Sequence, residues 1–321
     1  MNSGPKAADV ALRRELLSWY DQNRRDLPWR KSPDPYRVWI SEIMLQQTRV
    51  AAVLPKYESF LRRFPSVQKL AAARQASVLA QWSGLGYYRR ARNLHAAAKI
   101  VAREGKFPTT SQGWRALPGI GRYSAAAIAS IAFNEPVAVV DGNVERVLQR
   151  ILQRPCTQSQ AWQAAEDLLD TERPGDFNQA MMELGATICI PGRPLCHQCP
   201  IRAFCRTRGR GTAVRKQLTQ RKRQLSYVLL TRNDSVLLVQ RPRHASLMPG
   251  MWELPSANGT NRRHTLLFSA SHSITNTDYA VSVLAGPVPR KKGTWFKVSR
   301  LNAIPLTGVA RKILRKARII L

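Results

Sequence analysis

Leu117-Pro-Gly-Ile-Gly-Arg-Tyr123 is the stretch of sequence that decides the fold. Gly119 and Gly121 allow a tight turn that another molecule can approach closely. The next run, 124–132 (Ser-Ala-Ala-Ala-Ile-Ala-Ser-Ile-Ala), predicts a helix with Ser124 as its N-cap. A glycine turn that opens a helix points free backbone N–H groups outward, so this segment is suited to bind an anion such as a phosphate.

A carboxylate follows this predicted helix. Asp141 lies in Val140-Asp-Gly-Asn-Val-Glu-Arg146, eighteen residues after Tyr123. Its position predicts that it faces whatever the glycine turn holds. The alternative is a plain helical hairpin in which Asp141 only caps the next helix.

The composition favours a partner with negative charge. The chain has 321 residues, 51 basic and 20 acidic, for a formal charge of +31. It is 44% hydrophobic, enough for two folded domains. Such a charge favours nucleic acid or an anionic membrane, and the chain has no apolar run of the roughly 18 residues that a membrane span needs. The N-terminus carries no apolar segment typical of a secretory signal, so we expect no membrane association and a cytoplasmic, nucleoid-associated location.

Hydrophobic periodicity divides the chain into a helical region and a mixed region. Residues 1–205 are expected to form a mainly α domain, 206–223 a basic linker and 224–321 a small α+β domain. The expected helices are 11–20, 36–60, 66–82, 89–104, 144–152, 159–169 and 176–188. Beyond the linker we expect strands 226–231, 236–240, 279–285 and 294–298, a hairpin turn at Asn233-Asp234 and a helix at 307–316.

Four of the five cysteines form one cluster in the sequence. Cys189, Cys196, Cys199 and Cys205 have the spacing C-x6-C-x2-C-x5-C, which is typical of a metal site. Zinc and an iron–sulfur cluster both accept four cysteines. Zinc ribbons usually pair two C-x2-C knuckles and this segment has one, so we expect a [4Fe–4S] cluster at 189–205.

Together, the glycine hairpin, the Asp141 segment and the cysteine loop resemble the helix-hairpin-helix DNA glycosylases of the endonuclease III superfamily. Within that superfamily, residues 27–30 (Leu-Pro-Trp-Arg), 39–48 (Trp-Ile-Ser-Glu-Ile-Met-Leu-Gln-Gln-Thr) and 84–95 resemble the A/G-specific adenine DNA glycosylases of the MutY type. The resemblance covers about residues 8–255. It implies a two-lobed helical domain with an iron–sulfur loop and double-stranded DNA bound across the cleft.

Two carboxylates fit the chemistry that this resemblance implies. Glu42 lies in an apolar helix, which predicts a raised pKa and suits a general acid. By the resemblance, Glu42 protonates adenine at N7 and Asp141 stabilises the sugar cation, with Tyr123 and Asn143 beside them. The alternatives are an exposed helix glutamate and an N-capping aspartate. Tyr123 stands where strand-cleaving relatives carry a nucleophilic lysine, so we expect a monofunctional enzyme.

The resemblance also assigns the residues that contact DNA. The adenine pocket is expected at Arg25, Leu27, Trp29, Arg30 and Glu183. Glu183 is expected to accept a hydrogen bond from the exocyclic amine, whereas Trp29 and Leu27 are also ordinary core residues. Gln47 and Tyr87 are expected to wedge into the base stack, although Gln47 also fits a helix-surface amide. Thr48, Gly119 and Gly121 complete the expected DNA contacts.

The C-terminal region resembles the Nudix-like domain that MutY-type enzymes use to recognise 8-oxoguanine. The resemblance rests on 227–230, 236–242 and 250–255. Nudix hydrolases need several glutamates to bind Mg²⁺, but the only acidic residue after Glu253 is Asp278, which argues against nucleotide hydrolysis. The family's Phe-Ser-His triplet is missing. One alignment places Ile274-Thr275-Asn276 there, so that Thr275 and Asn276 read the lesion, and a shifted one proposes Ser271-His272.

The sequence therefore predicts a monomeric DNA glycosylase that removes adenine opposite 8-oxoguanine or guanine and so starts base-excision repair. One alternative is a thymine glycosylase for T:G mismatches on the same scaffold, against which Glu42 and the Nudix-like region argue. Another is a non-catalytic DNA-binding protein with an iron–sulfur loop, against which the presence of both Glu42 and Asp141 argues.

Overall fold

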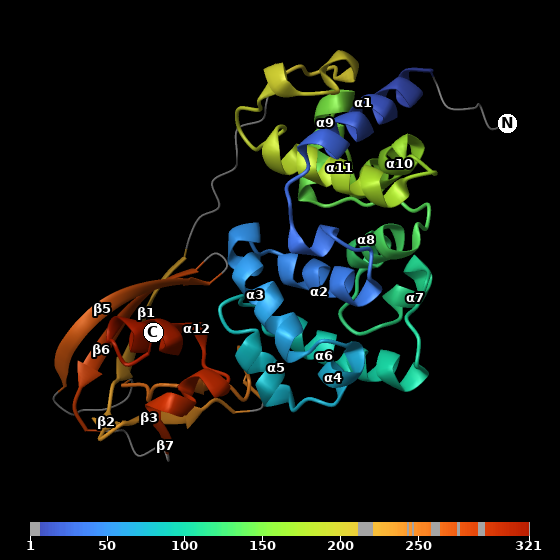
Figure 1. Ribbon diagram of the computed structural model, residues 1–321. Helices are drawn as coiled ribbons and strands as arrows, with labels where there is room; N and C mark the ends of the chain where they lie inside the picture. Colours follow the sequence, from blue (N-terminus) through green and yellow to red (C-terminus); the bar gives the residue numbers. More distant parts are fainter. Residues whose placement is uncertain are drawn as a thin grey trace. The chain divides into compact units, whose positions relative to one another are not determined.

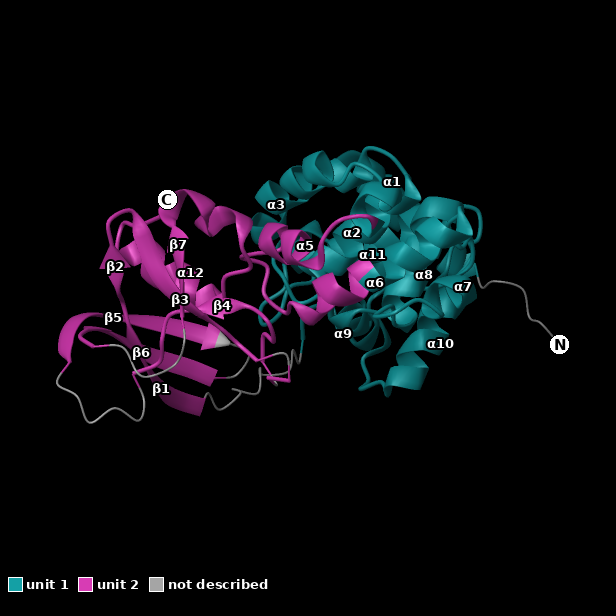
Figure 2. Cartoon of the chain, turned by 90° about the horizontal axis from the view of Figure 1, so that it is seen from below, with its two compact units in different colours: residues 1–71, 96–216 teal, residues 72–95, 217–321 magenta. Residues whose placement is uncertain are grey.

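The computed structural model describes residues 7–210, 221–242, 244–245, 247–257, 264–274, 277–287 and 293–320. Its contacts divide the chain into two compact units, residues 1–71 with 96–216 and residues 72–95 with 217–321 (Figure 2). The division expected from the sequence kept 72–95 with the helical domain, whereas the contacts group this segment with the C-terminal residues.

The first unit is helical (Figure 1). Its α-helices are α1 (Ala7–Asn23), α2 (Pro35–Leu45), α3 (Val50–Arg63), α4 (Val67–Ala71), α7 (Ser111–Arg115), α8 (Arg122–Phe133), α9 (Gly142–Leu152), α10 (Gln158–Leu168) and α11 (Pro174–Thr187). Short 3-10 turns are η1 (Pro28–Arg30), η2 (Cys196–Gln198) and η3 (Arg202–Phe204). Helix α6 (Arg89–Glu104) starts in the second unit and ends in the first.

The single helix predicted over 36–60 is wrong, because the chain breaks between α2 and α3. Gln47 adopts a left-handed backbone conformation (φ 53°), which ends helical hydrogen bonding there. Apolar periodicity continues across the break, so the sequence pattern did not reveal it. The helix predicted over 66–82 is likewise two helices, α4 and α5 (Gln75–Gln81).

The glycine hairpin forms as expected, but its helix begins earlier. Gly119 has a φ of 78°, and Gly121 is the N-cap of α8. The prediction that Ser124 caps this helix is therefore wrong. Ser124 is buried within α8, and its hydroxyl accepts a hydrogen bond from Gln46 Nε2 at 2.8 Å.

Helices α1, α9 and α11 share one apolar core. Glycine permits the close packing of α11 on the start of α9, since a Cβ at Gly185 would lie 2.7 Å from the Asn143 Cβ. This contact fixes the first turn of α9, and with it Asp141, against α11.

The second unit is α+β, as expected. One sheet has the order β1-β6-β5, in which β6 (Thr277–Ala285) runs parallel to β1 (Arg221–Val228) and antiparallel to β5 (Thr265–Ile274). In the other sheet β3 (Ser235–Gln240) pairs with β2 (Thr231–Arg232), β4 (Trp252–Glu253) and β7 (Thr294–Lys297).

Local signals account for several elements of this unit. The predicted turn at Asn233-Asp234 is confirmed, since Thr231 pairs with Val236 across it. Helix α12 (Gly308–Lys316) is capped by the Thr307 hydroxyl and packs its apolar face into this unit's core. Strand β5 was not anticipated. Across the described ranges, no helix is long and apolar enough to cross a membrane.

Candidate active site

A cavity of about 440 Å³ in the helical unit gathers most of the predicted site. Its walls come from η1, α2, α8, α11 and the start of α9. The predicted residues that line it are Arg25, Leu27, Trp29, Arg30, Glu42, Thr48, Tyr123, Asp141, Asn143 and Glu183. Segments that are more than 150 residues apart in the sequence, such as Arg25 and Glu183, thus share one cavity wall.

Glu42 lies on α2 and is only 6% exposed. Burial raises its pKa from 4.5 to about 7, against an opposing hydrogen bond from Tyr123 and the charge of Arg30. The Tyr123 hydroxyl donates to Glu42 Oε2 at 3.1 Å. The alternative of an exposed helix glutamate is therefore wrong, and the expected rise in the pKa is confirmed.

Asp141 combines both roles that the sequence left open, because it caps α9 and also lines the cavity. Its Oδ1 accepts hydrogen bonds from the backbone N–H groups of Asn143 (2.9 Å) and Val144 (2.7 Å), and its Oδ2 accepts from Asn143 Nδ2 (3.0 Å). The N-terminus of a helix is also favourable for a negative charge. A carboxylate so placed can stabilise a cation in the cavity.

Asn143 is held in turn by Arg146, one turn further along α9. The Arg146 guanidinium donates to Asn143 Oδ1 (2.9 Å), to the Gly185 carbonyl (2.7 Å) and to the Cys189 carbonyl (2.9 Å). These contacts fix the amide so that its nitrogen faces Asp141. The cysteine segment and the Asp141 carboxylate are therefore joined by two side chains.

Glu183, on α11, is 1% exposed and forms two ion pairs. It accepts from Arg25 Nε at 2.6 Å and from Arg30 Nη2 at 2.8 Å. Burial by itself would raise the pKa of Glu183, but the hydrogen bonds from the two arginines outweigh it and lower the pKa to about 2. To accept from an adenine amine, Glu183 would have to share or release one of these bonds.

Leu27 and Trp29 are both core residues and cavity residues. They are 5% and 7% exposed, and Trp29 packs edge-to-face on Tyr57 with ring centroids 5.3 Å apart. The same packing that buries these side chains gives the cavity an apolar, rigid wall.

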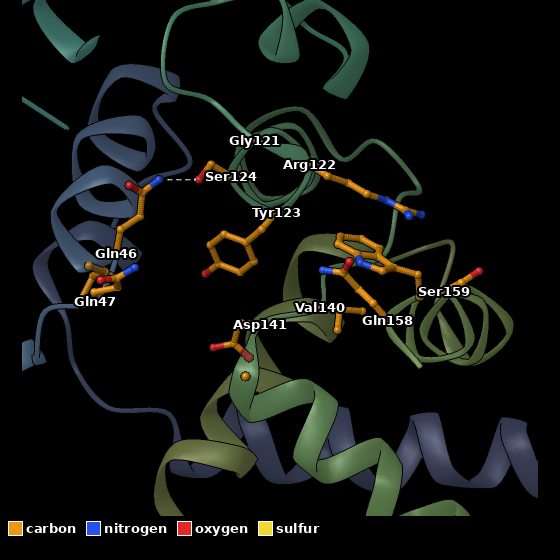
Figure 3. Close-up of a pocket in the computed structure, with 13 residues that line it drawn as sticks. Gln46, Gln47, Gly121, Arg122, Tyr123, Ser124, Val140, Asp141, Gln158 and Ser159 are labelled. Atoms are coloured by element: carbon orange, nitrogen blue, oxygen red, sulfur yellow. Dashed lines mark hydrogen bonds between the residues drawn. The ribbon is translucent and has the colours of Figure 1, made fainter. Parts of the chain in front are cut away.

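A larger cavity of about 760 Å³ shares Tyr123 and Asp141 with the first one. Figure 3 shows both side chains turned toward a space with Gln46 and Gln47 on one side and Gln158 on the other. Gly121 also lines it, and a Cβ at Gly121 would meet no atom within 4 Å. The hairpin backbone is therefore open to an external group, and a ligand in this space reaches the two site residues directly.

The two expected wedge residues share an unusual backbone. Gln47 and Tyr87 both have positive φ values, 53° and 46°, which bulky residues adopt at a cost. Tyr87 is 42% exposed, and the Arg90 guanidinium lies 5.4 Å from its ring centroid. Gln47 lies outside any helix, so its reading as a helix-surface amide is wrong. They belong to different units.

All four clustered cysteines line one small cavity, together with Arg150, Arg202 and Arg208. Arg150 Nη1 donates to Cys189 Sγ at 3.2 Å, and a Cβ at Gly209 would lie 3.1 Å from Cys196 Sγ. Among the described side chains, no three His, Cys, Asp or Glu are grouped closely enough to hold one metal ion.

Two predicted residues cannot be placed, because Thr275 and Asn276 lie outside the described residues. Beside them, Ser273 Oγ donates to Asp278 Oδ1. A residue that the sequence analysis missed is Met182, whose sulfur lies 3.3 Å from the Tyr123 hydroxyl oxygen. A methionine on a helix gives no signal of such a contact.

The chain is similar to known DNA repair proteins. Residues 40–170 match the family model described as HhH-GPD superfamily base excision DNA repair protein. The chain is 39% identical over 335 residues to the rat adenine DNA glycosylase, covering 83% of this chain and 65% of the rat protein. It is 49% identical over 218 residues to the human adenine DNA glycosylase, covering 63% and 40%. The chain thus spans between 40% and 65% of the length of these two relatives.

Solved structures give the same fold for the helical region. A thermostable thymine-DNA glycosylase is 28% identical with a TM-score of 0.58, covering 62% of this chain and 95% of that one. An endonuclease III trapped on DNA is 20% identical with a TM-score of 0.54, covering 62% and 94%, and shows likeness of fold alone. Residues 40–170 thus belong to the helix-hairpin-helix superfamily of base excision DNA repair proteins, and the chain is similar to adenine DNA glycosylases (MutY type).

Proposed function

We propose that this protein hydrolyses the N-glycosidic bond of adenine mispaired with 8-oxoguanine or guanine in double-stranded DNA, the first step of base-excision repair. The observation that carries the proposal is that one cavity holds two carboxylates in contrasting surroundings. Glu42 is buried with a pKa of about 7, whereas Asp141 accepts three hydrogen bonds at a helix N-terminus. Such a pair supplies an acid and an anion at the same pH.

In the proposed reaction the adenine leaves the duplex and enters the 440 Å³ cavity. Glu42 donates its proton to adenine N7, and the C1′–N9 bond breaks with its electron pair going to the base. The cation at C1′ lies against Asp141. Water then adds to C1′ and gives up a proton that restores the neutral form of Glu42, which leaves an abasic sugar and the neutral base. Tyr123 offers no amine for a Schiff base, so the DNA strand stays intact.

We propose that the cysteine cavity holds a [4Fe–4S] cluster. All four clustered cysteines line this cavity, and their spacing contains one C-x2-C knuckle rather than the two that zinc ribbons usually pair. Cys189, Cys196, Cys199 and Cys205 would hold the cluster, and the Arg150 donor would balance thiolate charge. When bound, the cluster would cross-link the cysteine loop. It would thereby fix the Cys189 carbonyl that accepts a hydrogen bond from Arg146.

The C-terminal unit is proposed to act as a Nudix-like reader of 8-oxoguanine, with Thr275 and Asn276 near the lesion. Its α+β fold supports this role, and its shortage of carboxylates argues against hydrolysis. The one glutamate of β4, Glu253, is engaged by Arg241 at 2.8 Å rather than exposed for Mg²⁺. We propose that the protein acts as a monomer on duplex DNA, with the net charge of +31 making binding strongly salt-dependent.

Thymine excision from T:G mismatches is the second candidate. The likeness to the thermostable thymine-DNA glycosylase at 28% identity favours it. The identities of 39% and 49% to adenine DNA glycosylases favour adenine.

Single-turnover base release separates these functions. Duplexes with A:8-oxoguanine, A:G, A:T and T:G are incubated with excess protein, then treated with or without alkali. We expect adenine release from the first two, with strand breaks only after alkali. Release from T:G alone would replace the proposed substrate, and duplex binding without release from any mismatch would contradict enzymatic function.

Asp141→Asn is the matched variant for this experiment. Asparagine caps helices as well as aspartate does, so α9 keeps its N-cap, but the negative charge is lost. We expect base release to be abolished and duplex binding in a gel-shift assay to persist. Unchanged base release would show that Asp141 is not the anion of the reaction.

A further inference from the structure

The Tyr123 hydroxyl stands between two acceptors. Its oxygen lies 3.1 Å from Glu42 Oε2 and 3.3 Å from Met182 Sδ. A phenol carries one proton, so it donates fully to only one of them at a time. A carboxylate is a strong acceptor and a thioether is a weak one.

We infer that Met182 is a positioning residue for the Glu42 general acid, because its sulfur competes with Glu42 for the single hydroxyl proton of Tyr123 and thereby favours the protonated form of Glu42. The role of Glu42 as the acid rests on the proposed function. The competition for the proton does not, since it is a property of the unliganded protein.

The direction of the effect follows from the two protonation states. When Glu42 is ionised, its oxygen takes the Tyr123 proton, and this bond stabilises the anion. When Glu42 is neutral, its oxygen is a weaker acceptor and the sulfur of Met182 offers the hydroxyl another partner. Met182 therefore stabilises the neutral state more than the ionised state.

Other charged groups near Glu42 act on it independently of Met182. Arg30 on η1 favours the anion, and Asp141 at the start of α9 opposes it. Glu183 on α11 lines the same cavity but is neutralised by Arg25 and Arg30. None of these groups changes when the sulfur of Met182 is removed. A shift of the Glu42 titration midpoint on its removal therefore reports a change in the hydrogen bond from Tyr123 to Glu42.

Met182→Leu is the substitution that removes the sulfur acceptor with little change in side-chain volume. Met182 is half-buried and packs on the cores of α8 and α11, where a leucine of similar volume fills the space without a lone pair. Met181, its neighbour on α11, is 2% exposed, lies in the core, and provides the matched control.

The test measures the Glu42 titration directly. The full-length protein is labelled with ¹³C at the glutamate carboxyl carbons, and the Glu42 resonance is assigned with Glu42→Gln. We expect Met182→Leu to lower the titration midpoint by about half a pH unit, as suits the loss of one weak hydrogen bond. Met181→Leu should leave the midpoint in place.

A double-mutant cycle decides whether the effect passes through Tyr123. In a Tyr123→Phe background the proton is absent, so Met182→Leu should cause no shift. An unchanged midpoint in the single variant, or an equal shift in the Tyr123→Phe background, would overturn the inference.

Base release against pH links the competition to the reaction. A general acid is lost as pH rises through its pKa, so Met182→Leu should release adenine about threefold more slowly above the midpoint. Absence of base release in the wild-type protein would contradict the proposed function alone, since the carboxyl titration would still decide the role of Met182.

Discussion

Two buried glutamates line the candidate active-site cavity, and the two behave in opposite ways. Glu42 is 6% exposed with a pKa raised to about 7, whereas Glu183 is 1% exposed with a pKa lowered to about 2. Burial penalises the anion at both residues. What differs is the number of cations that form hydrogen bonds with the carboxylate, which among the described residues is none at Glu42 and two at Glu183.

This comparison shows that depth in the protein does not set the charge of a carboxyl group. At Glu42 the hydrogen bond comes from the neutral Tyr123 hydroxyl, and desolvation has the largest influence on the pKa. At Glu183 two guanidinium groups compensate the buried charge. Glu42 is therefore suited to deliver a proton, and Glu183 to hold the pocket wall in a fixed geometry.

The largest expected effect comes from Glu42→Gln, which keeps the shape of the acid and removes its proton. We expect single-turnover adenine release to fall by about 10³-fold, the usual contribution of a general acid. Duplex binding and the circular dichroism spectrum should be unchanged. A fall of less than tenfold would mean that the raised pKa of Glu42 has no role in the reaction.

Glu183→Gln should instead act on stability, because it leaves Arg25 and Arg30 without their anion. We expect the free energy of unfolding to drop by about 3–5 kcal/mol in urea denaturation. Glu58→Gln is the control, since Glu58 forms an exposed pair with Arg62 and should change stability by less than about 1 kcal/mol. Equal losses in the two variants would show that the Glu183 ion pairs contribute no special stability.

The contributions of Glu42 and Glu183 to stability should depend on pH with opposite signs. The pKa of Glu42 is higher in the folded protein than its ordinary 4.5, so its stabilising contribution is full below pH 4.5 and is lost as pH rises to about 7. Between pH 4 and pH 8 we expect the wild-type protein to lose about 3 kcal/mol of unfolding free energy relative to Glu42→Gln.

The pKa of Glu183 is lowered, so its contribution is present above pH 4.5 and is lost as pH falls toward 2. The stability gap between wild type and Glu183→Gln should therefore close on acidification. If both gaps moved in the same direction with pH, the contrast between the two glutamates would be wrong.

The smallest expected effect is that of Arg25→Lys. The Arg25 side chain is 40% exposed, against 11% for Arg30, so solvent weakens its ion pair more. Lysine keeps the charge and loses the two-pronged contact with Glu183. Thermal unfolding should show a loss of about 1 kcal/mol. A loss of stability as large as that of Glu183→Gln would show that Arg25 alone supplies the stabilisation from the Glu183 ion pairs.

Local sequence signals predicted much of the fold and the site. The helix over 89–104, the Asn233-Asp234 hairpin and the mixed C-terminal unit follow from periodicity and turn chemistry. The burial of Glu42 and its raised pKa follow from its apolar helix. The break at Gln47 did not follow, because apolar periodicity continues through it. The start of α8 at Arg122 did not follow either, because Ser124 offers a stronger N-cap signal than Gly121, the N-cap observed.

By itself, the sequence determined which groups are available: a glycine turn that opens a helix, an aspartate that caps another, four spaced cysteines and a glutamate among apolar residues. Only the tertiary structure decided which of these groups meet. The pairing of Glu183 with two arginines and the contact of Met182 with Tyr123 join distant segments. Such contacts depend on how helices pack on one another, and hydrogen bonds and charges act over a few ångströms of space regardless of distance along the chain.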